Sequence, residues 1–76
     1  MNTPESEISR LEQLAEASYT KMYDAPRHGV RDHYEDASSY LAQAIALATR
    51  EEMPEAVERL KARKAHIYIV YTHQFR

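Results

Sequence analysis

Histidines and aspartates gather around the only glycine of the chain, and these residue types can bind metal ions or transfer protons. His28 and His33 lie close in sequence to Asp32 and Asp36, and the two aspartates share one face of a predicted helix. A metal site of His28, Asp32 and Asp36 can be drawn, but the paired histidine spacing of known zinc motifs is missing. We interpret the acids as the start of a helix, where they favour the positive end of its dipole.

The other side chains that could act in catalysis do not form a recognisable set. His66 and His73 are seven residues apart on one side of a predicted helix, which favours a pair at the solvent edge. No serine or threonine stands with a histidine and an acid at a spacing that identifies a triad, and the chain has no cysteine. Its six tyrosines are typical of core boundaries and interfaces. We expect no catalytic residue, no metal and no cofactor, and so a protein that is not an enzyme.

The sharpest charge feature is a basic stretch formed by Arg59, Lys61, Arg63, Lys64 and His66. These cations could contact phosphates, while the tyrosines that follow stack on bases. A solvated helix face explains the same charges, because Glu55 can pair with Arg59 four residues later and Glu58 with Lys61 three residues later. We favour the solvated face and keep a nucleic-acid contact as the alternative.

Composition sets wider limits on fold and function. The chain of 76 residues has room for one domain, so residues 1–76 are expected to form a single helical domain. One glycine and eleven alanines argue against barrels, sandwiches and glycine-rich phosphate loops. The formal net charge is -2, so the protein lacks the strong positive field of a dedicated nucleic-acid binder.

Charge and hydropathy along the chain also bear on its location. Residues 51–58 carry four acids and no base, whereas residues 59–76 carry five bases and no acid. No apolar stretch approaches the roughly 20 residues of a membrane span, and the first residues lack the pattern of a signal peptide. We expect a cytoplasmic protein with no membrane contact.

Two amphipathic helices are predicted in the first two thirds of the chain. The first runs from about residue 4 to 23, because Thr3 can cap it, Pro4 suits its first turn, and apolar or small residues recur at helical intervals behind them. A loop with Pro26 and Gly29 follows. The second helix spans about residues 30–50, and its alanine-rich stripe would let a neighbouring helix approach closely.

A third helix is predicted over about residues 54–72, beginning at Pro54. Its end is ambiguous, because residues 67–71 combine isoleucine, valine and tyrosine in a run that also suits a strand. No second strand is available to pair with it, so we favour the helix. Lys64 interrupts the apolar stripe, where its aliphatic stem can lie on apolar surface.

Short connections between three helices predict an all-α, antiparallel up-down-up three-helix bundle. The expected core residues are Leu11, Ala15, Met22, Ala37, Leu41, Ala44, Leu47, Val57, Leu60 and Ile67.

Residues 34–45 carry a local spacing seen in helical repeat proteins. The matching positions are Tyr34, Ala37, Leu41, Ala44 and Ile45. This run resembles the second helix of a tetratricopeptide repeat, and equally the middle helix of microtubule-interacting-and-trafficking modules. The loop before it is longer than a tetratricopeptide turn and no second repeat follows. The resemblance implies a helical-hairpin interaction scaffold and carries no site residue.

These observations predict a non-catalytic helical module that binds an unidentified protein partner and also pairs with itself as a homodimer. Large side chains occupy five consecutive positions from residue 67, so they surround the helix, and one bundle buries only one side. Ile69, with Tyr68 or Phe75 beside it, is then expected to point outward and form the dimer interface. The alternative is that Ile69 and Phe75 cover a flank of the first helix in the same chain.

Overall fold

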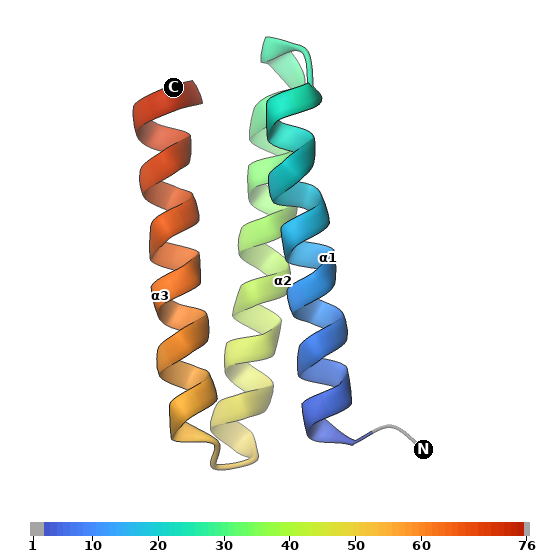
Figure 1. Ribbon diagram of the computed structural model, residues 1–76, viewed down its shortest axis with the longest axis vertical. Helices are drawn as coiled ribbons and strands as arrows, with labels where there is room; N and C mark the ends of the chain where they lie inside the picture. Colours follow the sequence, from blue (N-terminus) through green and yellow to red (C-terminus); the bar gives the residue numbers. More distant parts are fainter. Residues whose placement is uncertain (1–2, 76) are drawn as a thin grey trace.

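Three antiparallel helices form the protein, as expected from the sequence. The computed structural model describes residues 3–75 and places α1 at Pro4–Asp24, α2 at Val30–Arg50 and α3 at Pro54–Val70. Figure 1 shows them running up, down and up beside one another. A short 3-10 helix, Arg27–Gly29, leads into α2, and a π-helical segment, Tyr71–Phe75, continues α3. The predicted three-helix bundle is confirmed, and residues 67–71 are helical.

The start of α1 follows the capping signals in its sequence. The Thr3 hydroxyl accepts a hydrogen bond from the Ser6 amide at 3.0 Å, and Pro4 occupies the first turn. Glu7 pairs with Arg10 one turn later. These interactions satisfy an amide that the helix itself leaves without a partner and place negative charge near the positive end of the dipole.

The contact between α1 and α2 is the most extensive in the bundle. Small buried side chains line it, so the two backbones can approach closely: Ala15 and Ser18 on α1, and Ala37, Ala44 and Ala48 on α2. Larger side chains, among them Met22 and Leu41, fill the space that remains toward α3. The predicted apolar stripe of α1 is buried throughout.

The turn between α2 and α3 closes with a Schellman motif, which the sequence analysis did not predict. The Met53 amide donates to the Ala48 carbonyl at 2.9 Å, and the Glu52 amide donates to the Thr49 carbonyl at 3.2 Å. Glu52 has φ 56°, the left-handed conformation that glycine usually occupies in this motif. The sequence signal was absent because a glutamate stands where glycine is expected. Pro54 then begins α3 directly.

The last turn of the chain departs from the predicted α-helix over 54–72. The α-helix ends at Val70 and a π-helical segment carries the chain on to Phe75. A π-helix has more residues per turn, so each residue advances less around the axis. This rotation brings Phe75 round to α1, where its ring meets that of Tyr23.

Eight of the ten predicted core residues are buried, and the two exceptions lie at the edge of the core. Leu47 and Val57 are only partly buried and pack against the core from outside. Ala56 and Val70 are buried on α3 in addition to the predicted Leu60 and Ile67.

The bundle is flattened, with extents of 38 × 23 × 12 Å, and α3 packs more on α2 than on α1. None of the helices within residues 3–75 is both long enough and apolar enough to cross a membrane.

Candidate functional site

The two arginines of the basic stretch are engaged with α1. Arg63 donates from Nε and Nη2 to the Glu16 carboxylate at 2.7 and 2.6 Å, and Arg59 donates to Glu12 at 2.8 Å. The expected pairing of Glu55 with Arg59 along α3 was therefore wrong. Sequence spacing identifies only partners on the same helix, whereas the bundle places α1 and α3 parallel to each other, with Glu12 and Glu16 within reach of the two arginines.

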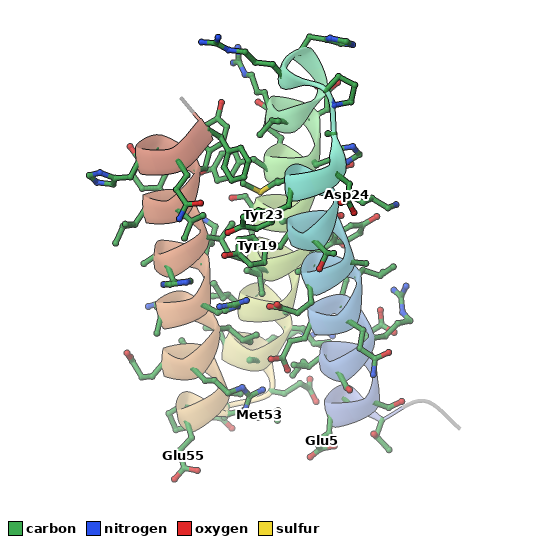
Figure 2. All side chains as sticks on the ribbon, turned by 45° about the horizontal axis from the view of Figure 1, so that its top comes forward. Glu5, Tyr19, Tyr23, Asp24, Met53 and Glu55 are labelled. Carbon is green, nitrogen blue, oxygen red and sulfur yellow. The ribbon has the colours of Figure 1, made fainter. Side chains whose placement is uncertain are left out.

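Tyr19 extends this polar contact between α1 and α3. The Arg63 guanidinium lies 5.0 Å from the centre of the Tyr19 ring, a cation–π geometry. Its hydrogen bonds to Glu16 raise the pKa of Arg63 further above its already high value. The hydroxyls of Tyr19 and Tyr23 are 3.1 Å apart, and this hydrogen bond raises the pKa of Tyr19. Figure 2 shows both tyrosines pointing from α1 toward α3.

Phe75 lies at the end of this aromatic series. Its ring meets Tyr23 edge to face at 5.1 Å, and it packs against the core within its own chain. It is therefore separate from Tyr68 and Ile69, the other two residues of the predicted interface.

Tyr68 and Ile69 are exposed on α3. Their relative exposures are 51% and 53%, which is high for large apolar side chains. Ala62 and Ala65 are also exposed, and their spacing of three and four residues places them on the same side of α3 as Ile69. The outer face of α3, which we define as Ala62, Ala65, Tyr68 and Ile69, carries no charged side chain of its own.

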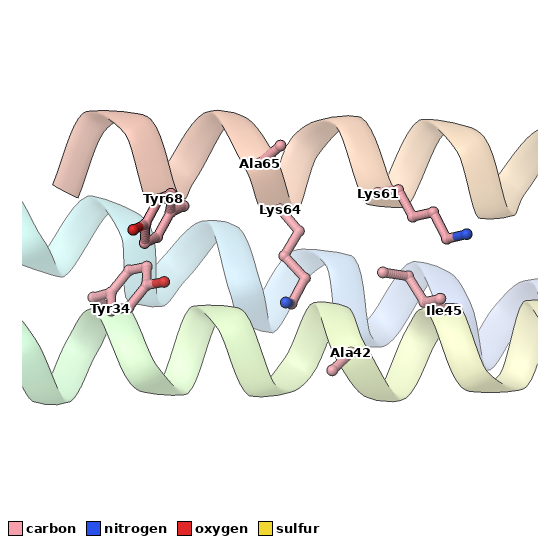
Figure 3. Close-up of a pocket in the computed structure, with 7 residues that line it drawn as sticks. All are labelled: Tyr34, Ala42, Ile45, Lys61, Lys64, Ala65 and Tyr68. Carbon is pink, nitrogen blue, oxygen red and sulfur yellow. The ribbon is translucent and has the colours of Figure 1, made fainter. Parts of the chain in front are cut away.

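A groove runs between α2 and α3 on the side away from α1. It has a volume of about 500 Å³, and Figure 3 shows its lining residues: Tyr34, Ala42, Ile45, Lys61, Lys64, Ala65 and Tyr68. A second hollow of about 420 Å³ continues it toward the turn between α2 and α3, with Lys61 lining both. We call these two hollows together the α2/α3 groove.

Tyrosines close one end of the α2/α3 groove. The Tyr34 ring stacks on that of Tyr71 at 4.1 Å, nearly parallel at 7°, and lies 6.3 Å from the ring of Tyr68. Burial raises the pKa of the Tyr34 hydroxyl, while a hydrogen bond with Ser38 acts in the opposite direction. The stacked pair holds α2 to the π-helical segment that continues α3, at this end of the groove.

The basic stretch thus divides between two sides of α3. Arg59 and Arg63 lie toward α1, whereas Lys61 and Lys64 line the α2/α3 groove. Within residues 3–75 neither lysine forms an ion pair, so the expected pairing of Glu58 with Lys61 is not found. His66 is exposed.

The histidines and aspartates near Gly29 do not form a metal centre. His28, Asp32 and Asp36 are exposed, and no three His, Asp or Glu side chains among residues 3–75 are arranged to hold a metal ion.

The α2/α3 groove was not predicted from the sequence. One signal pointed to it: Lys61 and Lys64 are three residues apart on one side of α3, while Arg59 and Arg63 are four apart on the other. The basic residues were treated as one stretch, so their division between two sides of the helix was overlooked.

Comparison with known proteins identifies no relative: no protein-family model, curated protein or solved structure matches the chain. The resemblance of residues 34–45 to helical repeats is expressed in the packing of α2, where Ala37, Leu41 and Ala44 are buried.

Proposed function

We propose that this protein is a non-catalytic helical protein-protein interaction module of the cytoplasm that associates with itself, as a twofold homodimer, through the outer face of α3. One observation carries the proposal: Ile69 is 53% exposed beside Tyr68 on a face that the bundle does not cover. Exposed apolar patches of this kind mark interaction sites on soluble proteins.

The geometry of the outer face suits a second helix. Ala62, Ala65 and Ile69 recur at intervals of three and four residues, the spacing of a helix-packing seam. The two alanines are small, so another α3 can approach closely before Ile69 makes contact. A twofold axis would cover both copies of the patch at once, which is the commonest arrangement in small oligomers.

Light scattering at micromolar concentration tests the dimer. We expect a mass of twice the 8.9 kDa of one chain for the wild type and a folded monomer for Ile69→Glu. Ala46→Glu is the matched control, since it adds the same charge at an exposed position of α2 and should leave the dimer intact. A wild-type mass of one chain would contradict the proposal.

The alternative function, a nucleic-acid contact through residues 59–66, has weaker support. Two of the four arginine and lysine side chains in that stretch are paired with Glu12 and Glu16. Nucleic-acid binding that weakens steeply between low and physiological salt would favour this alternative.

A further inference from the structure

The α2/α3 groove has the shape of a helix-binding site. Along α3 it extends from Pro54 to Tyr68, which corresponds to about 21 Å, or four turns of helix. The side chains between its rims are apolar, and two of the four are alanines: Ala42, Ile45, Val57 and Ala65. An amphipathic helix that lies in such a groove places residues at intervals of three and four against the floor.

The charges of the groove define the chemistry of its occupant. Lys64 is partly buried and reaches from α3 toward α2, with Lys61 one turn away along α3 (Figure 3). Within the described chain neither ammonium group has an acidic partner, although both arginines nearby have one. Glu52 and Glu58 line the end of the groove near the turn. Acidic side chains of an occupant would be repelled there, so they are expected beside Lys61 and Lys64.

Three other occupants fit the groove less well. A second copy that pairs groove to groove, with the twofold axis at the middle of the groove, would set Lys61 against the same lysine of its twin, because this residue lines both hollows. A small molecule would remain largely exposed, since the groove is open along its length. For a nucleic acid the groove offers only two cations without an acidic partner, and its apolar floor does not bind phosphates.

We infer that the α2/α3 groove binds a helix of another protein, about four turns long, with an apolar stripe flanked by aspartate or glutamate. The apolar stripe covers Ala42, Ile45 and Ala65, and the flanking acids pair with Lys61 and Lys64. This inference rests on the proposed role as an interaction module. The groove shares Ala65 and Tyr68 with the outer face of α3, but Lys61 and Lys64 lie outside that face, so the inference does not require self-association.

The test uses a synthetic helical peptide of about 16 residues, with leucines at helical intervals and glutamates on both flanks. It is titrated into isotopically labelled protein and followed by nuclear magnetic resonance. We expect amide shift changes at Ala42, Ile45, Ala65 and Tyr68. The same peptide with lysines in place of the glutamates should bind at least about tenfold more weakly.

Charge reversal on the protein provides the matched comparison. The double variant Lys61→Glu with Lys64→Glu should bind the acidic peptide about tenfold or more weakly than the wild type does, and it should bind the lysine peptide more tightly. Lys21→Glu with Arg27→Glu changes the net charge equally on exposed positions away from the groove and should change neither affinity. If the Lys64 variant does not fold, Ala42→Trp serves instead, because it fills the groove from an exposed position of α2.

Several outcomes would overturn the inference. They are no binding of the acidic peptide, equal binding of both peptides, shift changes confined to other surfaces, and tighter binding of a single-stranded oligonucleotide at the same lysines. Repeating the titration with Ile69→Glu separates the two proposals, since that variant removes the dimer interface and leaves the lysines of the groove unchanged. Failure of the peptide with both the wild type and Ile69→Glu, while the wild type remains a dimer, therefore overturns this inference and not the proposed self-association.

Discussion

Arg63 connects α3 to α1 by contacting two side chains, and its contribution to stability depends on shape as well as charge. Its guanidinium holds the Glu16 carboxylate through two hydrogen bonds and lies over the Tyr19 ring. Both side chains of the ion pair are substantially exposed, so the charge term alone should be small. The planar fork and the ring contact are features that lysine cannot reproduce.

We therefore predict that Arg63→Lys lowers the free energy of unfolding by about 0.5 to 1 kcal/mol, although it keeps the charge. Urea denaturation measures this change. Arg31→Lys is the control, because Arg31 pairs with Glu35 at 3.5 Å on an exposed surface and should change stability less. Equal losses for the two substitutions would show that the stacking on Tyr19 contributes nothing.

Tyr34 makes the stability of the protein depend on pH in the alkaline range. Burial raises the pKa of its hydroxyl above the ordinary value of 10.0, which the unfolded chain retains. Below that pH the phenol is neutral in both states. As the pH rises beyond it, the unfolded chain loses its proton first, so the folded state loses stability until its own Tyr34 ionises.

The wild type should accordingly lose more stability between pH 9 and pH 11 than Tyr34→Phe does. Urea midpoints at both pH values measure the difference, and ultraviolet absorbance follows ionisation of the phenols. Parallel pH profiles for the two proteins would show that Tyr34 does not titrate differently in the folded state.

At the scale of the elements, the end of α2 contains a residue in an unfavourable conformation. Glu52 adopts φ 56°, which costs a side chain with a Cβ atom about 1 kcal/mol. We predict that Glu52→Gly increases the free energy of unfolding by up to about 1 kcal/mol, because glycine adopts this φ without strain. Thermal and urea denaturation measure the gain.

Glu51→Gly is the control for that substitution. Glu51 has φ -89°, where glycine offers no relief and adds freedom to the unfolded chain. It should lower stability, and a gain for both variants would point to charge removal from the acidic turn as the cause.

The central position of α2 predicts a large effect for one core residue. Leu41 is 1% exposed and lies in the core cluster, so Leu41→Ala should cost about 2 to 5 kcal/mol through lost burial and the cavity left behind. Leu47→Ala on the same helix should cost clearly less, because that side chain is only partly buried. Equal costs in urea denaturation would mean that α2 is not the centre of the bundle.

The helices could be predicted from the sequence because their signals are local and repeated. Thr3 and Pro4 indicated the start of α1, and regular apolar spacing placed Leu41 and Leu60 in the core. Three features could not be predicted: the pairs of Arg59 and Arg63 with α1, the left-handed Glu52, and the turn of Phe75 toward Tyr23. Each depends on tertiary packing, which overrides the local preference of the residue concerned.

The candidate site was only partly predictable for a related reason. The exposure of Tyr68 and Ile69 could be predicted, because five consecutive large side chains surround α3 and the bundle buries only one side of it. The α2/α3 groove depends on how two helices sit side by side, and periodicity within a single helix contains no such information.

At the scale of the whole molecule, the arrangement joins a close pair of helices to a third that is held by longer side chains. α1 and α2 contact each other through small residues, whereas α3 reaches α1 by ion pairs and aromatic rings. The flattened bundle leaves one side of α3 uncovered and a groove beside α2. Both proposed surfaces therefore involve α3, one on its outer face and one on its flank.

Pro54 has a consequence for how two copies can combine. Exchange of α3 between copies, known as domain swapping, would require α2 and α3 to straighten into one continuous helix across the turn. Proline cannot donate the backbone hydrogen bond that such a helix needs at this position, and its ring would clash with the carbonyl of Arg50 four residues earlier. Pro54→Ala should therefore yield a slowly exchanging swapped dimer that persists in Ile69→Glu, detectable by size-exclusion chromatography after refolding at high concentration. Pro54 thereby favours copies that each keep their own α3.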